Sequence, residues 1–344
     1  MKIALCSTFV PFIRGGARNI VDWLATMLER AGHQVEVVYL PEVDAPSLLF
    51  PQMAAFRWVD LSAADRVICF RPQAHFINHP HKILWFIHHI RTFYDLWDTD
   101  YRGFDDDVRH RGIRDALHAA DTAAIGESVK VFTNSKVVSE RLMQFNGTPS
   151  EVLYPPIFDA SRFHCAGFND EVVYICRMEP HKRQHLLLEA MQYVTTPVRL
   201  RLCGKSGHAA YKEQLEGLVQ AHGLHDRVAI EDRWISEDEK VQLLADCLMA
   251  AYLPHDEDSY GYPSLEASHA GKAVLTTTDS GGVLELVNDG DNGFVLDPDP
   301  RQLAAAMDSL YLDRARAARM GTRALERLDE LRISWAHVVE RILA

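Results

Sequence analysis

Short apolar runs alternate with stretches of helical periodicity along almost the whole chain. Residues 2–7 and 33–40 read as strands, and residues 19–32 between them space their apolar side chains as an amphipathic helix does. The same order begins again at 130–145 and at 171–191. Alternation of this kind predicts βαβ units around parallel sheets, which places the chain in the α/β class.

The alternation pauses once, at Tyr154-Pro155-Pro156. Proline removes a backbone N–H and fixes φ, so neither a helix nor a central strand continues through this tripeptide. A chain of 344 residues is long enough for two domains, each with a core of its own. We therefore expect two Rossmann-like doubly wound domains, residues 1–156 and 157–329, that face each other across a cleft. In such sheets ligands bind at the carboxyl ends of the strands.

The composition argues against several classes of function. The formal net charge of -12 disfavours nucleic-acid binding, because that relies on cations that face phosphate. No apolar run approaches the ~20 residues that a membrane-spanning helix requires, so any membrane contact is expected to be peripheral. The six cysteines are scattered without a Cys-x-x-Cys pair, which favours a reducing compartment. We expect a cytoplasmic protein, with the inner face of the membrane as the alternative location.

Two loops of the N-terminal half carry residues of functional interest. Gly15-Gly16 follows the first strand and lets backbone approach a ligand, although for a glycine pair alone a plain loop is the simpler interpretation. His88 and His89 end another apolar run, where a histidine can accept a hydrogen bond from a substrate hydroxyl. Further histidines precede them, but their spacing fits no zinc pattern and no acid lies among them. We expect no metal site.

Arg177 directly follows a strand of the C-terminal half, and Lys182 stands five residues later at the expected start of a helix. A cation at the amino end of a helix opposes the helix dipole, so a purely structural role there is unfavourable. Two cations beside unpaired backbone N–H groups instead suit a diphosphate. After a later strand, Gly281-Gly282 is expected to expose further N–H groups at a helix start. We interpret Arg177 and Lys182 as a phosphate clamp.

The stretch 256–274 packs acids, tyrosines and glycines into one loop-to-helix turn. Helix chemistry explains part of it, because Pro263 suits a first helical position, Ser264 can cap the helix and Gly271 can end it. The acids in front of the helix stay unexplained by that interpretation. Carboxylates gathered in one loop are expected to accept hydrogen bonds from several hydroxyls, such as those of a sugar and a ribose joined by a diphosphate.

Together these residues resemble the GT-B retaining glycosyltransferases of family four, which share a Glu-x7-Glu motif. The resemblance extends over nearly the whole chain, and the segment 256–298 is its most specific part. The other matching runs are Gly15-Gly16, 131–142, 152–157 and 176–183. The resemblance implies a GT-B fold whose final helix, about residues 330–344, crosses back onto the first domain. It also implies transfer of a hexosyl group from a nucleotide-diphosphate sugar.

The same resemblance implies a role for each acid and cation. Arg177 and Lys182 would hold the donor diphosphate, and Glu266 would bind the ribose of the nucleotide. Asp258 stands where the family usually has its first glutamate, which binds the hydroxyls of the transferred sugar. The motif here is Asp-x7-Glu, one methylene shorter, and Glu257 could partly substitute.

The remaining candidates follow from the same comparison of motifs. The backbone N–H groups of Tyr260 and Gly261 would approach the sugar phosphate, and Gly15-Gly16 would close over it from the other domain. His88 aligns with a strand-end histidine that the family has near the reacting centre, with His89 as the alternative. The implied catalytic residues are therefore His88, Arg177, Lys182 and Asp258.

The implied reaction retains the anomeric configuration, proceeds by front-side displacement and uses neither a metal nor a cofactor. The acceptor would be a glycan, a lipid-linked glycan or a small molecule. Two alternatives stay open: a catalytically silent nucleotide-sugar-binding protein, because the first motif acid is altered, and a GT-B nucleotide-sugar epimerase. A nicotinamide dehydrogenase is disfavoured because the chain lacks the Gly-x-Gly-x-x-Gly fingerprint.

Overall fold

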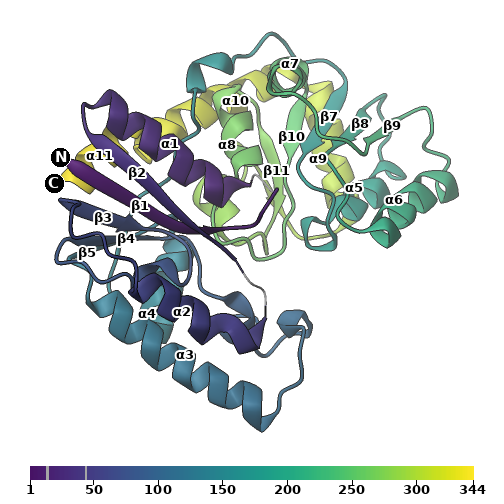
Figure 1. Cartoon of the computed structure of the whole chain (residues 1–344). Coiled ribbons are helices and arrows are strands. Elements are labelled where there is room, and N and C mark those ends of the chain that lie inside the picture. Colours follow the sequence, from purple (N-terminus) through teal and green to yellow (C-terminus); the bar gives the residue numbers. More distant parts are fainter. Residues whose placement is uncertain (13–14, 43–44) are drawn as a thin grey trace. The chain divides into compact units, whose positions relative to one another are not determined.

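The computed structural model describes residues 1–12, 15–42 and 45–344. Contacts between Cα atoms divide the chain into two compact units, one made of residues 1–156 and 333–344 and the other of residues 157–332. Each unit contains one six-stranded sheet, and the neighbouring strands in both sheets are parallel. Helices connect the strands in each unit (Figure 1). The prediction of two Rossmann-like α/β domains is therefore confirmed.

The N-terminal unit has the strand order β2-β1-β3-β4-β5-β6. Its strands are β1 (Lys2–Phe9), β2 (Gln34–Pro41), β3 (Arg66–Cys69), β4 (Lys82–Phe86), β5 (Lys130–Thr133) and β6 (Glu151–Val152). Its α-helices are α1 (Gly16–Arg30), α2 (Leu49–Arg57), α3 (Val108–Gly126), α4 (Lys136–Asn146) and α11 (Trp335–Leu343).

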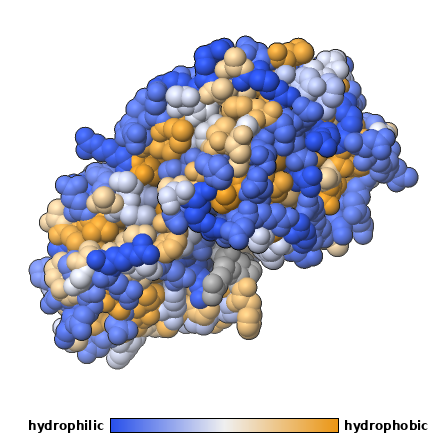
Figure 2. All heavy atoms as spheres, turned by 90° about the horizontal axis from the view of Figure 1, so that it is seen from above, coloured by the Kyte–Doolittle hydropathy of each residue, from blue (hydrophilic) through white to orange (hydrophobic). Residues whose placement is uncertain are grey.

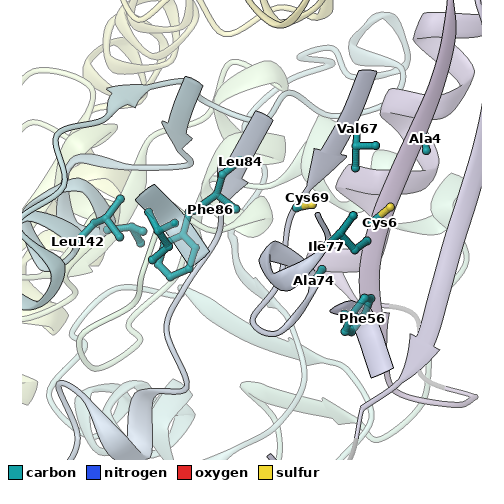
Figure 3. Close-up of a cluster of buried hydrophobic side chains, with 12 residues drawn as sticks. Ala4, Cys6, Phe56, Val67, Cys69, Ala74, Ile77, Leu84, Phe86 and Leu142 are labelled. Carbon is teal, nitrogen blue, oxygen red and sulfur yellow. The ribbon is translucent and has the colours of Figure 1, made fainter. Parts of the chain in front are cut away.

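Buried apolar side chains from strands and helices meet in the core of this unit. Figure 3 shows them on β1, β3, β4, α2, α4 and the turn after β3, including Ala4, Cys6, Phe56, Val67, Cys69, Ala74, Ile77, Leu84, Phe86 and Leu142. Cys6 and Cys69 are free thiols that are fully buried there. They pack there as small hydrophobic residues.

The last helix, α11, packs with the N-terminal unit although it follows the C-terminal unit in sequence. It lies beside α1 (Figure 1). Its apolar side is buried through Val338 and Ile342. On its polar side, Arg341 Nε lies 2.7 Å from Glu151 Oε1 of β6. An amphipathic helix needs such an apolar surface to cover, which is why this short segment is helical.

The C-terminal unit has the strand order β12-β11-β10-β7-β8-β9. Its strands are β7 (Glu171–Ile175), β8 (Arg199–Cys203), β9 (Val228–Glu231), β10 (Met249–Ala251), β11 (Val274–Thr277) and β12 (Gly293–Leu296). Its α-helices are α5 (Gln184–Met191), α6 (Ala209–Ala221), α7 (Glu237–Asp246), α8 (Tyr262–His269), α9 (Pro300–Leu312) and α10 (Arg314–Glu330).

The surface is mixed in character. On the face drawn in Figure 2, hydrophilic residues cover much of the surface and hydrophobic residues form separate patches between them. Large apolar side chains such as Phe12, Trp58 and Trp234 are exposed, and such single exposures are ordinary in folded proteins. Within the described part of the chain, no helix has both the length and the apolar character needed to cross a membrane.

Candidate functional site

The strand order of the C-terminal unit reverses between β7 and β10. From β7 the chain continues to β8 and β9 on one side, whereas β10, β11 and β12 lie on the other (Figure 1). Open parallel sheets bind ligands outside the carboxyl ends of their strands at such a switch point. The loop after β7 carries Arg177 and Lys182, and the loop after β10 carries Asp258. The topology thus makes neighbours of the two loops that the sequence singled out.

Lys182 is the buried cation of this site, with 8% of its surface exposed. Its Nζ donates a hydrogen bond of 2.9 Å to the Tyr252 hydroxyl and also contacts the Glu257 carboxylate. Lys182 ends the 3-10 turn Pro180–Lys182, and α5 begins only at Gln184. The expectation that Lys182 opens the helix is therefore wrong, because the chain turns once more before α5.

Arg183 makes that turn, in a conformation that a residue with a Cβ seldom adopts. Its φ is 53°, in the left-handed region. Its guanidinium donates hydrogen bonds of 2.7 Å to both carboxylate oxygens of Asp279 and of 2.8 Å to the carbonyl oxygens of Leu253 and Pro254. Charge-assisted bonds of this kind offset the backbone strain. They also tie the loop after β7 to the loops after β10 and β11.

Arg177 is held much less firmly than Lys182. Its side chain is 52% exposed, and its Nη1 lies 3.8 Å from Glu179 Oε1. The Glu179 side chain is nearly buried and lies 3.2 Å from Nε2 of His208. An ion pair with one solvated partner at this separation contributes little free energy. The Arg177 guanidinium can therefore turn toward an anion at low cost.

The acidic loop after β10 sends Glu257 toward Lys182. The Tyr252 hydroxyl donates a hydrogen bond of 3.2 Å to Glu257 Oε2. Burial disfavours the charged carboxylate, but the charge and hydrogen bond of Lys182 outweigh it, so the pKa of Glu257 lies below its ordinary value. Asp258, the next residue, is partly exposed. Glu257 is thus an ionised partner of Lys182, whereas sequence reasoning considered it only as a substitute sugar ligand.

The Gly281-Gly282 pair serves close packing between two loops. The Gly282 N–H donates a hydrogen bond of 2.8 Å to the carbonyl oxygen of Glu257. A Cβ at Gly281 would lie 2.5 Å from that same oxygen, and one at Gly282 would lie 2.6 Å from Cα of Ser259. The expectation that this pair exposes N–H groups is therefore wrong for Gly282, because the acidic loop already occupies its N–H.

Helix α8 begins directly after Gly261, whose φ is 69°. A Cβ at Gly261 would come within 2.3 Å of the Tyr252 ring, so the acidic loop can pass here only as glycine. Pro263 lies in the first turn, as expected. Ser264 does not cap the helix, because it lies inside α8 and its hydroxyl donates to the Gly261 carbonyl at 2.9 Å. Gly271, with φ of 61°, follows the end of the helix as expected.

Glu266 lies on α8 and is 8% exposed. Burial raises the pKa of its carboxyl, and the charge and hydrogen bond of Lys240 oppose that shift. Lys240 Nζ, from the first turns of α7, lies 2.6 Å from Glu266 Oε1. It also lies 2.9 Å from the exposed carboxylate of Glu237. Sequence reasoning missed Lys240, which stands 26 residues before its partner; the available signal was that a buried carboxylate requires a cation.

The N-terminal unit holds the two candidate histidines. His89 is 2% exposed, its Nε2 lies 2.8 Å from Asn146 Oδ1, and its ring packs against Phe86 and Tyr94. His88 is half-buried, and its Nδ1 lies 2.7 Å from the His89 carbonyl oxygen. A carbonyl only accepts, so Nδ1 of His88 carries the hydrogen. Burial lowers the pKa of His88 to about 3, which leaves a neutral ring whose Nε2 can accept a hydrogen bond.

Gly15 and Gly16 stand at the start of α1. Gly15 is the N-cap residue, and its carbonyl oxygen accepts a hydrogen bond of 3.0 Å from the Arg18 N–H. Among the described residues, a Cβ at Gly15 would meet no atom within 4 Å. Packing against these residues therefore does not require glycine at position 15, and the approach of its backbone to a ligand stays a prediction.

The histidines that precede His88 take part in the packing of the N-terminal unit. His75 Nε2 lies 2.9 Å from Asp121 Oδ1, and the Tyr94 hydroxyl donates to the other oxygen of Asp121 at 2.6 Å. No acid stands among these histidines in the sequence, but the fold brings Asp121 into contact with His75. Among residues 1–12, 15–42 and 45–344, no group of three or more His, Cys, Asp or Glu side chains is placed to hold a metal ion.

Comparison with known proteins bears on the C-terminal unit most directly. Residues 168–327 match the family described as glycosyl transferases group 1. The chain is 29% identical over 127 residues to an alpha-1,3/1,6-mannosyltransferase of Dictyostelium discoideum, covering 37% of this chain and 30% of that protein. It is 29% identical over 179 residues to a D-inositol 3-phosphate glycosyltransferase of Xylanimonas cellulosilytica, covering 50% and 40%. The match thus spans well under half the length of these curated relatives.

Solved structures resemble the whole chain. HepE of Anabaena, solved in complex with UDP, aligns with a TM-score of 0.72 at 19% identity and covers 100% of this chain and 98% of its own. Sucrose-phosphate synthase of Thermosynechococcus elongatus aligns with a TM-score of 0.78 at 16% identity, covering 98% and 97%. At these identities the likeness establishes the fold, which is the GT-B fold with its two Rossmann-like domains. The chain therefore has the GT-B fold, and its residues 168–327 match the glycosyl transferases group 1 family.

Proposed function

We propose that this chain transfers a hexosyl group from a nucleotide-diphosphate sugar to a glycan, lipid-linked or small-molecule acceptor, with retention of configuration and without a metal ion. The observation that carries the proposal is that the loop with Arg177 and Lys182 and the Asp-x7-Glu loop follow neighbouring strands at one switch point, where Lys182 contacts Glu257. The group 1 match spans both loops and supports a nucleotide-sugar donor. Relatives named as a mannosyltransferase and an inositol phosphate glycosyltransferase support hexose transfer.

Arg177 and Lys182 would bind the donor diphosphate and stabilise the charge that grows on it as the glycosidic bond breaks. Their surroundings differ in a way that suits two tasks. Lys182 is buried and fixed by Tyr252, so it acts as a preorganised charge, while Arg177 is exposed and closes onto the ligand. Cations that meet the leaving diphosphate directly take over the role that a divalent metal plays in other transferases.

The two acids of the motif would bind opposite ends of the donor. Glu266, buried and held by Lys240, would accept hydrogen bonds from the ribose. Asp258 would accept hydrogen bonds from the transferred sugar. The backbone N–H groups of Tyr260 and Gly261, at the amino end of α8, would approach the sugar phosphate.

His88 would contact the sugar or the acceptor from the N-terminal domain. Its neutral ring and the hydrogen on Nδ1 leave Nε2 to accept a hydrogen bond from a hydroxyl. This polarity suits a sugar hydroxyl and does not suit a phosphate. His89 is engaged with Asn146, which favours His88 for the role. Front-side displacement would let the departing diphosphate remove the proton of the attacking hydroxyl, so the mechanism needs no carboxylate nucleophile.

A thermal-shift screen of nucleotide sugars tests the donor, because a ligand that binds only the folded form raises its melting temperature. The nucleotide sugar that stabilises the protein most is then incubated with candidate acceptors, in EDTA and in manganese. NMR of the product gives its anomeric configuration. We expect transfer with retention in EDTA. Binding without transfer or epimerisation would favour the silent binding protein, and absence of any stabilising nucleotide sugar would overturn the proposal.

A further inference from the structure

The pairing of Lys182 with Glu257 is a feature of this chain that the two motifs do not account for. Glu257 precedes the Asp-x7-Glu pair and is 75 residues away from Lys182, yet the two side chains are in contact. Tyr252 bridges them, since its hydroxyl accepts from Lys182 Nζ at 2.9 Å and donates to Glu257 Oε2 at 3.2 Å. The buried cation proposed for the diphosphate therefore already has an anionic partner.

The backbone of Glu257 is held in place from both sides. Its carbonyl oxygen accepts the Gly282 N–H at 2.8 Å, and its own N–H points to the Ser280 carbonyl oxygen at 3.4 Å. Gly281 also approaches this segment closely, since a Cβ there would lie 2.5 Å from the Glu257 carbonyl oxygen, so the segment packs tightly against the loop after β11. Glu257 can thus yield Lys182 only by rotating its side chain.

Lys182 has equally little freedom on its own side. It is 8% exposed, and its carbonyl oxygen accepts a hydrogen bond from the buried Tyr174 hydroxyl, which anchors the turn before α5. Arg183, fixed to Asp279, prevents the turn from opening. Because the backbones of Lys182 and Glu257 are both held in place, a diphosphate and the Glu257 carboxylate must compete for the same ammonium group.

We propose that Glu257 is an internal competitor of the diphosphate for Lys182 and so sets the affinity of the phosphate clamp. An anion that enters must exchange the Glu257–Lys182 contact for its own, and it then lies near the Glu257 carboxylate, which repels it. Both effects weaken the binding of diphosphate and favour release of the nucleoside diphosphate that a transfer reaction leaves behind. The inference rests on the proposed function for its biological use, but the competition itself depends only on the described contacts.

Inorganic pyrophosphate is the probe, because it has the diphosphate alone and lacks base, ribose and sugar. Calorimetry measures its affinity for wild type, Glu257→Gln, Lys182→Ala and the double variant. We expect Glu257→Gln to bind pyrophosphate roughly 10-fold more tightly or better, since a charged hydrogen bond is no longer exchanged. The gain should vanish in the Lys182→Ala background, where nothing is left to compete for.

Glu213→Gln, on the exposed side of α6, is the matched control because it makes the same change in net charge. Its pyrophosphate affinity should equal that of wild type. Glu257→Asp serves as a second variant that keeps the charge but shortens the reach to Lys182, and it should show a smaller gain. Far-UV circular dichroism and melting temperature establish that each variant is folded.

Unchanged or weaker pyrophosphate binding in folded Glu257→Gln and Glu257→Asp would overturn the inference, as would a gain that persists without Lys182. Failure of the proposed function looks different. In that case wild type binds no nucleotide sugar, while the gain in pyrophosphate affinity is still present. If nucleotide sugars turn over and Glu257→Gln binds pyrophosphate as wild type does, the inference alone fails.

Discussion

Replacement of Lys240 by methionine tests whether Lys240 keeps Glu266, the residue proposed to bind the ribose, in its ionised form. Methionine keeps an unbranched apolar side chain but removes the ammonium group that lies 2.6 Å from Glu266. The Glu266 carboxylate, 8% exposed, must then either stay ionised without its cation or take up a proton. The neighbouring carboxylate of Glu237 adds to the repulsion, because it too raises the pKa of Glu266.

Proton uptake by Glu266 sets an upper bound on the folding stability that Lys240→Met loses. A glutamate in the unfolded chain has a pKa of about 4.3, and each pH unit above it corresponds to about 1.36 kcal/mol, so holding the protonated form at pH 7 costs about 3.7 kcal/mol. At pH 5 the same arithmetic leaves about 1 kcal/mol. In the variant the folded-state pKa of Glu266 exceeds the unfolded value, since burial already raises it beside Lys240. The penalty is therefore absent below the unfolded pKa and grows as the pH rises toward the folded pKa.

Melting temperatures at pH 5 and pH 7 measure this difference. For a domain of this size, 1 kcal/mol corresponds to about 2–4 °C, so Lys240→Met should lower the midpoint by up to about 7–15 °C at pH 7 and by about 2–4 °C at pH 5. The control is Glu237→Gln, which removes the other carboxylate partner of Lys240. Because the Glu237 side chain is 64% exposed, this substitution should change stability by less than about 1 kcal/mol. Equal losses at both pH values, or a loss no larger than that of the control, would refute the reasoning.

Four further predictions concern the donor site. Arg177→Ala should weaken nucleoside diphosphate binding roughly 10- to 150-fold by calorimetry, since a charged hydrogen bond contributes about 1.5–3 kcal/mol, and Arg177→Lys should recover part of it because a point charge cannot reproduce a guanidinium fork. Glu266→Gln should weaken the binding of the donor and of the free nucleoside diphosphate alike, because both contain the ribose, whereas Asp258→Asn should weaken mainly the intact donor. If both substitutions weaken the two ligands equally, the assignment of roles is wrong. His88→Ala should lower turnover while nucleoside diphosphate affinity stays near that of wild type, and a loss of that affinity would contradict its placement near the sugar. Activity should survive EDTA, and turnover that requires added manganese or magnesium would contradict a metal-free mechanism.

Features that depend on residues close together in the sequence could be predicted from it. The alternation of apolar runs and helical periodicity predicts two α/β domains because both patterns are local, and the two parallel sheets confirm it. Arg177 and Asp258 could be singled out for a similar reason. Each lies in a loop that follows a buried strand, and loops at the carboxyl ends of parallel strands gather at one edge of a sheet. Pro263 and Gly271 are likewise placed by the local chemistry of helix ends.

Contacts between distant segments were decided only by the tertiary structure. Glu257 meets Lys182 because β7 and β10 are neighbours at the switch point, and the fold brings Lys240 of α7 to 2.6 Å from Glu266 of α8. Neither pairing leaves a periodic or spaced pattern in the sequence, since strand order and packing bring these residues together. The Gly282 N–H was misjudged for the same reason: local sequence shows a flexible glycine pair, but the acidic loop that occupies its N–H comes from another part of the chain.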